Sequence, residues 1–426
     1  MRGVQQRIGL VLIMLVGVGA LVAGVWASVA GEAAPTVGEA LAQALPSQGE
    51  QCLACHLGIE SISASHAELG CVDCHGGNGA ATNEDRAHVG MVVNPGDLQY
   101  AEQYCGECHD GHLAFVERSL MATYAGGIAQ VRRSFGLQPD DKAVYGIAAV
   151  GRLQAFSVKP DDPLVMHQFA ENCLSCHIGG EPIAADYHYR STGCTACHML
   201  YGNDGLYTGG DPTIARDEAG HALRHEFTTS IPYWQCNHCH NRGNFDLRTM
   251  TFVGRNDLPP HAGLSPHEER LTDYYQPIGQ FTLCEWELDC IDCHTAQEVM
   301  GNGQVYDNRA QAQYVSCATC HGTLDELPQS MTIASAADLA LVRARLNPVL
   351  DLAVGDEVLM TERREAVWNV RREGDRWVLY TKVGGAAYDV PLATGTACLQ
   401  NPVEQESRYC HNCHAFDRAA VLGADE

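Results

Sequence analysis

The longest apolar run of the chain stands at its beginning. It comprises 23 residues, from Ile8 to Ala30, follows two arginines and is interrupted only by Ser28. A run of this length can cross a bilayer as a helix, and the cores of most signal peptides are shorter. We expect residues 1–30 to be a retained membrane anchor, with a cleaved signal peptide as the alternative. Residues 31–50, rich in alanine and glycine and containing two prolines, are expected to be a linker.

Hydrophobic periodicity is weak over most of the remaining chain. The clearest helical pattern covers residues 112–135, where apolar residues from Leu113 to Phe135 recur at helical spacing. Gly126 and Gly127 weaken the middle of this helix, because glycine loses more backbone freedom on folding than other residues. The apolar stripe indicates core packing or contact with a bound group.

A different pattern occupies residues 326–405. A helix is predicted from Ser335 to the residue before Asn347, which precedes a proline. Two segments rich in strand-forming residues, Ala366–Val370 and Arg376–Val383, flank a charged turn and predict a β-hairpin. A third short strand is expected after the glycine pair that follows. We therefore expect this region to be a small α+β insertion.

Nine copies of the pattern Cys-x-x-Cys-His add chemistry to this picture. They account for 18 of the 20 cysteines. Their cysteines are Cys52, Cys55, Cys71, Cys74, Cys105, Cys108, Cys173, Cys176, Cys194, Cys197, Cys236, Cys239, Cys290, Cys293, Cys317, Cys320, Cys410 and Cys413. Their histidines are His56, His75, His109, His177, His198, His240, His294, His321 and His414.

This pattern is the attachment signal for c-type haem. The two thiols form thioethers with the haem vinyl groups, and the adjacent histidine becomes the proximal ligand of the iron. Zinc half-sites and redox dithiols also use Cys-x-x-Cys, but neither needs a histidine directly after the second cysteine. A chain of 426 residues does not need a disulfide framework to fold either. The sequence therefore predicts nine covalently attached c-type haems.

A second axial ligand distinguishes a closed haem from one with an open coordination site. Eleven histidines lie outside the proximal positions, and we set aside His238 and His411 because they lie inside attachment motifs. Nine candidates for nine haems permit bis-histidine ligation throughout and leave none spare. The candidate distal ligands are His66, His88, His112, His167, His188, His221, His225, His261 and His267.

These candidates are unevenly distributed. After His267, His411 is the only histidine outside a proximal position, so haems 7, 8 and 9 take distal ligands from upstream chain or differ from the others. Met300 and Tyr314 are local alternatives at haems 7 and 8, although packing is the commoner role of both residues. An open coordination site is expected at these three haems if the chain has one.

Two cysteines, Cys284 and Cys398, lie outside the motifs. In an oxidising compartment such a leftover pair commonly forms a disulfide. A disulfide here ties the insertion to the region of haem 7. A free thiol and a thiolate iron ligand are the alternatives.

The chain is acidic, with 27 Lys and Arg against 52 Asp and Glu and a formal net charge of -25. Nucleic acid is therefore not an expected partner. A negative surface favours ferric over ferrous iron and attracts cationic partners, and it also serves solubility. No phosphate-binding or dinucleotide-binding glycine pattern occurs.

From Cys52 to His414 the chain resembles the multihaem cytochromes c. The resemblance implies a mainly α-helical and irregular fold with a haem-filled core, histidine-ligated irons and low potentials. The haem count and motif spacings do not single out a subfamily. The expected divisions are the anchor or signal peptide at 1–30, the linker at 31–50, an eight-haem region at 51–325, the α+β insertion at 326–405, and the ninth haem site with a tail at 406–426.

Two functions compete on this basis. The first is electron transfer on the periplasmic or cell-surface side of the membrane, with a quinol or redox proteins as partners and a homo-oligomer or filament as one possible assembly. The second is a multihaem oxidoreductase that acts on a small nitrogen or sulfur compound at one five-coordinate haem. The first is favoured because many haems in a short chain suit conduction better than chemistry at a single site. No catalytic side chain is assigned.

Overall fold

The computed structural model describes residues 49–174, 177–185, 188–202, 204–240, 245–246, 251–252 and 288–396. Within these residues no helix is both long enough and apolar enough to cross a membrane. The predicted anchor at 1–30, nearly all of the linker and the ninth haem site lie outside them. The part of the chain that is described has mixed helix and strand content.

The helices are short, and several begin at a side-chain cap. Asn83, Asp97 and Ser119 each accept a hydrogen bond from a backbone N–H of the first turn. The 3-10 helices are η1 (Cys52–Ala54) and η2 (Ala64–His66). The α-helices are α3 (Cys71–His75), α4 (Glu84–Ala87), α5 (Leu98–Tyr104), α6 (Gly106–Val116), α7 (Leu120–Thr123), α8 (Ala125–Ser134), α9 (Leu164–Asn172), α10 (Thr195–His198), α11 (Tyr233–Asn237), α14 (Cys290–Cys293), α15 (Ala296–Met300), α16 (Arg309–Ala312), α17 (Cys317–His321) and α18 (Leu339–Leu346).

The single helix predicted over residues 112–135 is wrong, because α6, α7 and α8 divide this stretch. Ser119 starts α7 by accepting a hydrogen bond from the N–H of Ala122. Tyr124 then takes a left-handed conformation, with φ of 52°, between α7 and α8. A side chain at Gly127 would collide with the Tyr124 ring, so the glycine permits the break. Apolar periodicity does not reveal such a break when the apolar positions continue in phase across it.

A five-stranded antiparallel sheet occupies the predicted insertion. Its order, β11-β10-β9-β8-β7, follows the chain and makes it a meander. The predicted hairpin is confirmed, because β9 pairs with β10 across a two-residue turn that begins at Gly374. The expected third strand is β11, whereas β7 and β8 had no clear sequence signal. The strands are β7 (Ser330–Thr332), β8 (Glu357–Met360), β9 (Ala366–Glu373), β10 (Arg376–Tyr380) and β11 (Ala387–Val390).

Helix α18 is the helix predicted after Ser335. It begins at Leu339 because Asp338 accepts a hydrogen bond from the N–H of Ala340, 3.0 Å away. Helix α18 covers the sheet through a buried cluster that contains Leu341 and Trp368.

A second buried cluster joins the sheet to two attachment motifs. It contains Val370 and Trp377 of the sheet, and the partly buried Cys293 and Cys320 pack against it. The motifs that begin at Cys290 and Cys317 therefore lie against the sheet.

Three small two-stranded sheets complete the secondary structure of the described residues. Strands β1 and β2 are parallel, and the other two pairs are antiparallel. The strands are β1 (Tyr145–Gly146), β2 (Gln154–Ala155), β3 (Ile183–Ala185), β4 (His188–Arg190), β5 (Phe245–Asp246) and β6 (Thr251–Phe252).

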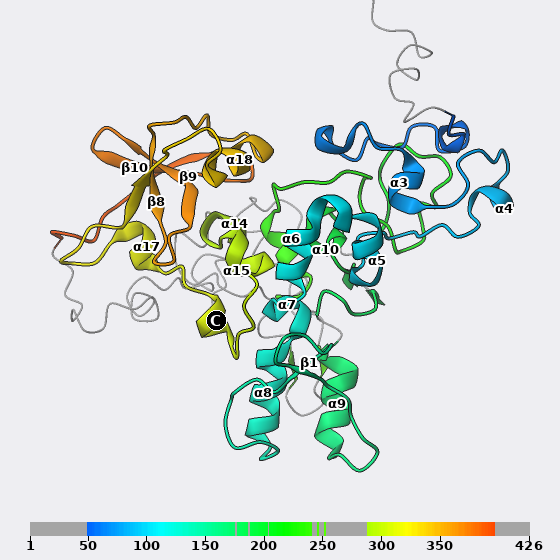
Figure 1. Ribbon diagram of the computed structural model, residues 1–426, viewed down its shortest axis with the longest axis horizontal. Coiled ribbons are helices and arrows are strands. Elements are labelled where there is room, and N and C mark those ends of the chain that lie inside the picture. Colours follow the sequence, from blue (N-terminus) through cyan, green and yellow to red (C-terminus); the bar gives the residue numbers. More distant parts are fainter. Residues whose placement is uncertain are drawn as a thin grey trace, which may run out of the picture.

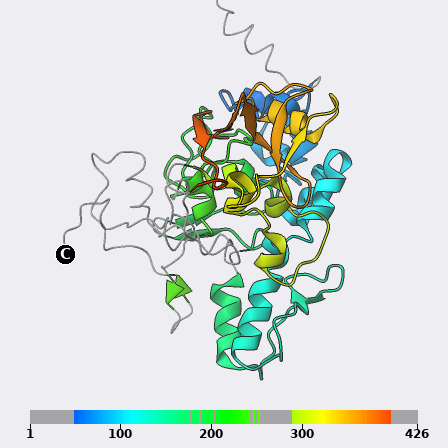
Figure 2. The same ribbon diagram turned by 90° about the vertical axis from the view of Figure 1, so that its left-hand side faces the viewer.

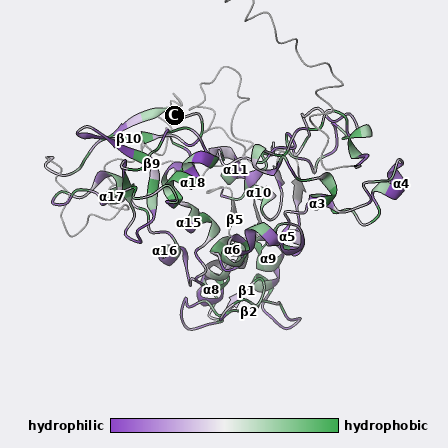
Figure 3. Cartoon of the chain, turned by 45° about the horizontal axis from the view of Figure 1, so that its top comes forward, coloured by the Kyte–Doolittle hydropathy of each residue, from purple (hydrophilic) through white to green (hydrophobic). Residues whose placement is uncertain are grey.

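Figure 1 shows how these parts are arranged in space. Helices α3 and α4, with the first two motifs, lie at one end of the molecule, and the sheet with α18 lies at the other. Helices α6, α10, α14 and α15 lie between these ends. Helices α8 and α9 project from the centre side by side in both views (Figures 1 and 2), packed around the buried Ile128, Met166 and Phe169. Helix α4, at the periphery, is largely hydrophilic (Figure 3).

Candidate haem sites

Three of the described attachment motifs fold as one helical turn, in α3, α14 and α17. Residues three and four positions apart lie on one face of a helix, so both sulfurs and the histidine of a motif are turned to the same side. Attachment of one haem through two thioethers and an iron ligand requires this arrangement. Each turn is started by a backbone N–H that donates to the side chain three residues later. The donor and acceptor residues are Gly70 and Asp73, Asp289 and Asp292, and Ser316 and Thr319.

Cysteines of different motifs lie next to each other. The Sγ atoms of Cys52 and Cys71 and a carboxylate oxygen of Glu50 lie within 4.8 Å of one another. Cys236 and Cys290 are also in hydrogen-bonding contact. The first site therefore adjoins the second, and the sixth adjoins the seventh.

These sulfurs are poorly suited to bind a metal ion as thiolates. Burial, with help from Cys52 and Glu50, raises the pKa of Cys71 to about 12. Burial is also the largest cause that raises the pKa of Cys194 and of Cys197 to about 11. A thiolate ligand needs the opposite environment, which lowers its pKa. A neutral thioether sulfur costs nothing to bury, so the donor set fits covalent haem better than zinc.

Three proximal histidines each face a second histidine. Two imidazoles bound to opposite sides of one metal, with metal–nitrogen bonds of about 2 Å, have ring centres roughly 6 Å apart. The observed separations therefore fit one haem iron between the members of each pair. The distances between ring centroids are 6.2 Å for His56 and His88, 6.0 Å for His75 and His225, and 6.2 Å for His109 and His66.

Hydrogen bonds at Nδ1 orient many of these rings. An imidazole whose Nδ1–H donates to the protein keeps its proton there and leaves Nε2 free for a metal. Backbone carbonyls accept from His75, His198, His321 and His225, and the Ser63 hydroxyl pairs with His66. The Nδ1–oxygen distances are 2.8 Å from His75 to Val92, 2.9 Å from His198 to Thr228, 2.6 Å from His321 to Pro391, 3.0 Å from His225 to Glu60, and 2.7 Å from His66 to Ser63.

Two proximal histidines have a carboxylate at Nδ1 instead. Nδ1 of His56 lies 2.7 Å from Oδ2 of Asp211, and Nδ1 of His294 lies 3.1 Å from Oε2 of Glu298. Both carboxylates are buried, with side-chain exposures of 0% for Asp211 and 3% for Glu298. Three of the described proximal histidines, His75, His198 and His321, are thus held by carbonyls, and two, His56 and His294, by carboxylates.

Burial keeps several of these imidazoles neutral. It is the largest cause that lowers the pKa of His66, His75, His198 and His240, and the charge of a neighbouring histidine lowers each further. Neutral imidazole is the form that binds a metal.

Residues 204–229 form one loop that serves the first two sites. It carries Asp211 against His56 and His225 against His75. Its end supplies the Thr228 carbonyl that accepts from His198 of the fifth motif. Three sites therefore depend on the position of one segment.

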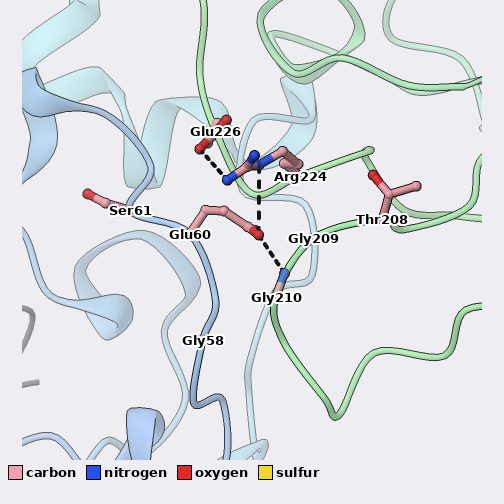
Figure 4. Close-up of a pocket in the computed structure, with 8 residues that line it drawn as sticks. All are labelled: Gly58, Glu60, Ser61, Thr208, Gly209, Gly210, Arg224 and Glu226. Carbon is pink, nitrogen blue, oxygen red and sulfur yellow. Dashed lines mark hydrogen bonds and ion pairs between the residues drawn. The ribbon is translucent and has the colours of Figure 1, made fainter. Parts of the chain in front are cut away.

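Glu60 holds this loop in place. Oε1 of Glu60 accepts a hydrogen bond from the N–H of Gly210 at 2.6 Å, and Oε2 accepts from the N–H of His225 at 3.0 Å and from the Tyr207 hydroxyl at 2.8 Å. Figure 4 shows Glu60 between Gly210 and Arg224, whose Nε lies 3.9 Å from Oε1. This cluster forms part of the lining of an open cavity of about 600 Å³, in which Arg224 also pairs with Glu226 (Figure 4).

The fourth site differs from the others. His177 follows α9, and its Nδ1 accepts a hydrogen bond from the N–H of Gly179 at 3.2 Å. Burial and the guanidinium of Arg190 lower the pKa of His177 to about 4, although Asp97 opposes them. In its neutral form this histidine therefore carries its proton on Nε2. Iron binding at Nε2 of His177 would therefore require this proton to be lost, which His75 and His198 do not require.

Of the other predicted distal histidines, His112, His167 and His221 have no partner ring among the described residues at the separation found in the three pairs above. Nδ1 of His112 lies 3.3 Å from Nδ1 of His109. Burial, the charge of His109 and the charge of His112 lower the pKa of His198, in that order. His112 therefore lies between the third and fifth sites. His167 lies in α9, and His221 lies on the 204–229 loop without a ring partner among the described residues. His188 lies in β4. Cys176, His261, His267, Cys284, Cys398, Cys410, His411, Cys413 and His414 lie outside the described residues.

The two local alternatives at haems 7 and 8 are placed differently. The Tyr314 hydroxyl donates to Oε2 of Glu365 at 2.6 Å, and burial and this bond raise its pKa. A phenol held in this way is a poor iron ligand. Met300 ends α15, which packs against α6. His238, set aside in the sequence, is buried with its ring 6.2 Å from that of Trp234.

Sequence reasoning missed the partners of the histidines. Glu298 lies only four residues after His294, but no helical pattern joins them, because His294 follows the end of α14 and Glu298 lies in α15. Asp211 carried no sequence signal, since it lies 155 residues from His56 and only the fold brings them together. Backbone carbonyls such as that of Val92 have no sequence signature at all.

Replacement of Glu60 tests the role of the loop. We expect Glu60→Ala to speed amide hydrogen exchange at Gly210 and His225 and to lower the free energy of unfolding by about 2 kcal/mol, because hydrogen bonds to a charged acceptor are lost. Hydrogen-exchange mass spectrometry and urea denaturation measure these effects. Ser61→Ala is the matched control and should change neither. Unchanged exchange at both amides in Glu60→Ala would contradict the role assigned to Glu60.

The contribution of Glu60 to the free energy of unfolding depends on pH. Burial raises the pKa of Glu60, but the N–H of His225, the Tyr207 hydroxyl and the N–H of Gly210 outweigh it and hold the pKa below its usual 4.5. A group with a lowered folded pKa contributes stability above the unfolded value and loses it as pH falls through the folded value. The difference in stability between the wild type and Glu60→Ala should therefore be full above pH 4.5 and shrink below it.

Comparison with known proteins adds one match. A family model described as cytochrome c3 matches residues 46–121, a stretch that contains the motifs beginning at Cys52, Cys71 and Cys105. No curated protein and no solved structure matches. The match supports a multihaem c-type cytochrome, and with it c-type haem binding and multihaem electron transfer.

Proposed function

We propose that this protein is an electron relay that carries nine c-type haems on the outer side of the cytoplasmic membrane. The observation that carries the proposal is the set of facing imidazoles, with ring centres 6.0 to 6.2 Å apart, beside attachment motifs whose sulfurs adjoin. Bound haem supplies a one-electron couple between Fe(III) and Fe(II). The chain's own contribution is to orient the ligands and to keep the sites close.

The ligand assignments follow from the histidine pairs. His88 is the proposed distal ligand opposite His56, His225 opposite His75, and His66 opposite His109. In the second of these pairs both rings donate Nδ1–H to backbone carbonyls, so both Nε2 atoms are free of protons and would be available to a bound iron. Two imidazoles on one iron leave no open position for a substrate, which favours a relay over an enzyme at these sites.

Neighbouring cysteines link six of the described sites in the order first, second, third, fifth, sixth and seventh, which passes over the fourth. In each linked pair, the two cysteines belong to different motifs and are close enough for the charge of one to raise the pKa of the other. The third motif is linked in this way to the fifth. His109 and His198, from the same two motifs, are also close enough for the charge of His109 to lower the pKa of His198 after burial. The linked cysteines are Cys52 and Cys71, Cys74 and Cys105, Cys105 and Cys194, Cys197 and Cys236, and Cys236 and Cys290.

This order supports conduction along the molecule. Tunnelling rates fall exponentially with distance, so neighbouring attachment sulfurs favour rapid transfer. The path begins with the first two motifs at one end of the molecule and reaches α14 beside the sheet (Figure 1). A relay of this kind accepts electrons at one end and releases them at the other. The partners we propose are a quinol or redox proteins, cationic ones being favoured by the net charge of -25.

Spectroscopy of the isolated protein tests the relay. We expect nine haems per chain by pyridine haemochrome and mass measurement, and ferric electron paramagnetic resonance (EPR) signals that are low-spin. Bis-histidine ligation is the reason, since two strong axial ligands give low-spin iron. A substantial high-spin ferric signal that responds to nitrite or cyanide would instead support an oxidoreductase and contradict a fully closed relay.

Replacement of one distal histidine tests the ligand assignment. We expect His225→Ala to convert one of the low-spin signals to high-spin, with the mass of attached haem unchanged because both thioether cysteines remain. Added imidazole should restore the low-spin signal. Glu226→Gln, at the adjacent exposed residue, is the matched control and should leave the spectrum as it is. A wild-type spectrum in His225→Ala would overturn the assignment.

We also propose that residues 1–30 export the chain and anchor it, because the apolar run there is long enough to span a bilayer. We expect the full-length protein to remain with membranes after alkaline carbonate extraction, with its haem domain accessible to protease from outside. A mature N-terminus that begins near residue 30, in a soluble extract, would contradict the anchor and favour a cleaved signal peptide.

A further inference from the structure

The two carboxylate-held histidines set the first and seventh sites apart from the others. His56 pairs with Asp211 and His294 pairs with Glu298, whereas Nδ1 of His75, His198 and His321 meets only the neutral oxygen of a peptide. The difference at Nδ1 is therefore one full negative charge beside the proximal ring.

Both carboxylates are built into place by other hydrogen bonds. Oδ1 of Asp211 accepts from the N–H and the hydroxyl of Thr213 at 2.9 and 2.8 Å. Glu298 accepts from the N–H groups of Tyr314 and Val315, each at 2.6 Å, and of Thr295 at 3.2 Å. These donors fix each carboxylate with one oxygen directed at the imidazole.

The donors around each carboxylate favour its ionised form, because a carboxylate that accepts several hydrogen bonds is stabilised with its charge. Each carboxylate therefore brings a negative charge next to a proximal ring.

A charged acceptor at Nδ1 alters the electron donation of the imidazole more than a neutral carbonyl does. It draws the Nδ1 proton towards itself and makes Nε2 a stronger electron donor to a bound metal. A buried negative charge also stabilises the more positive of two oxidation states. Both effects favour Fe(III) over Fe(II), and hydrogen bonding and charge around a haem are known to set its potential.

We infer that Asp211 and Glu298 are positioning residues that lower the reduction potential of haems 1 and 7 relative to the haems whose proximal histidines are held by carbonyls. This inference rests on the proposed function, because it takes His56 and His294 to be iron ligands. The step concerned is a single electron passed from a reduced neighbour to Fe(III), which becomes Fe(II) while the neighbour is oxidised. No bond is made or broken, and no further reactant is needed.

The inference gives the relay an energy profile. The first site lies at the end that contains α3 and α4, and the seventh lies beside the sheet (Figure 1). An electron on the relay is then more stable on the second and fifth haems than on the first or the seventh. The haems between the two low-potential sites therefore hold electrons until a partner oxidises them.

One cation opposes the effect at the seventh site. The partly buried ammonium of Lys382 donates to the carbonyl of Ile291, in the same motif as His294, and its positive charge acts against that of Glu298. The variant that tests the inference must therefore change Glu298 and leave Lys382 in place.

The test is a potentiometric titration of the full-length, haem-loaded protein, in which EPR follows each haem. In Asp211→Asn we expect one haem to become easier to reduce and the g values of its ferric signal to change, and the same in Glu298→Gln for a different haem. Asp217→Asn, on the same loop, and Glu326→Gln remove one exposed carboxylate each and are the matched controls. Neither control should shift the reduction potential of one haem while the others stay unchanged.

Conservative variants keep the test decisive if an amide variant folds poorly. Glu298→Asp retains the charge but shortens its reach, so we expect a smaller shift in the same direction. Nine attached, low-spin haems whose potentials match those of the controls would overturn the inference and leave the proposed function standing. Loss of bis-histidine signals in the wild type would overturn the proposed function instead.

Discussion

The hydrogen bond at Nδ1 of the histidines that carry one is the interaction on which the arrangement of the described sites depends. An imidazole can present Nε2 to a metal only if its proton and its ring plane are fixed by something else. In the second site both rings are fixed in this way, by the carbonyls of Val92 and Glu60. Because such acceptors belong to the backbone, the path of each loop decides which histidine meets which site.

This dependence explains why irregular segments matter more here than long helices. The 204–229 loop holds a carboxylate for one site, a ring for the next and a carbonyl for a third. Glu60 gathers that loop through its carboxylate and its own carbonyl. The five-stranded sheet plays a comparable part at the other end, where Pro391 accepts from His321 and the buried cluster packs against Cys293 and Cys320.

The sequence could predict the chemistry of the sites better than their architecture. Nine motifs predict the attachment residues, and strand-rich segments around Gly374 predict the hairpin that the structure has. The break at Tyr124 escaped prediction because a left-handed residue does not disturb apolar periodicity. The pairing of His75 with His225 escaped it as well, since a contact across 150 residues depends on the loop and leaves no local pattern. Histidine counting supplied the candidates, and only the fold brings three of them to face their partners.

The positions of the irons test this account most directly. A crystal structure of the haem-loaded protein with anomalous scattering at the iron edge would locate every iron without reference to the chain. We predict an iron between His75 and His225, and an iron of the third motif whose neighbour is that of the fifth. An iron at the second motif with a different distal ligand, or a spatial order that simply follows the sequence, would contradict it.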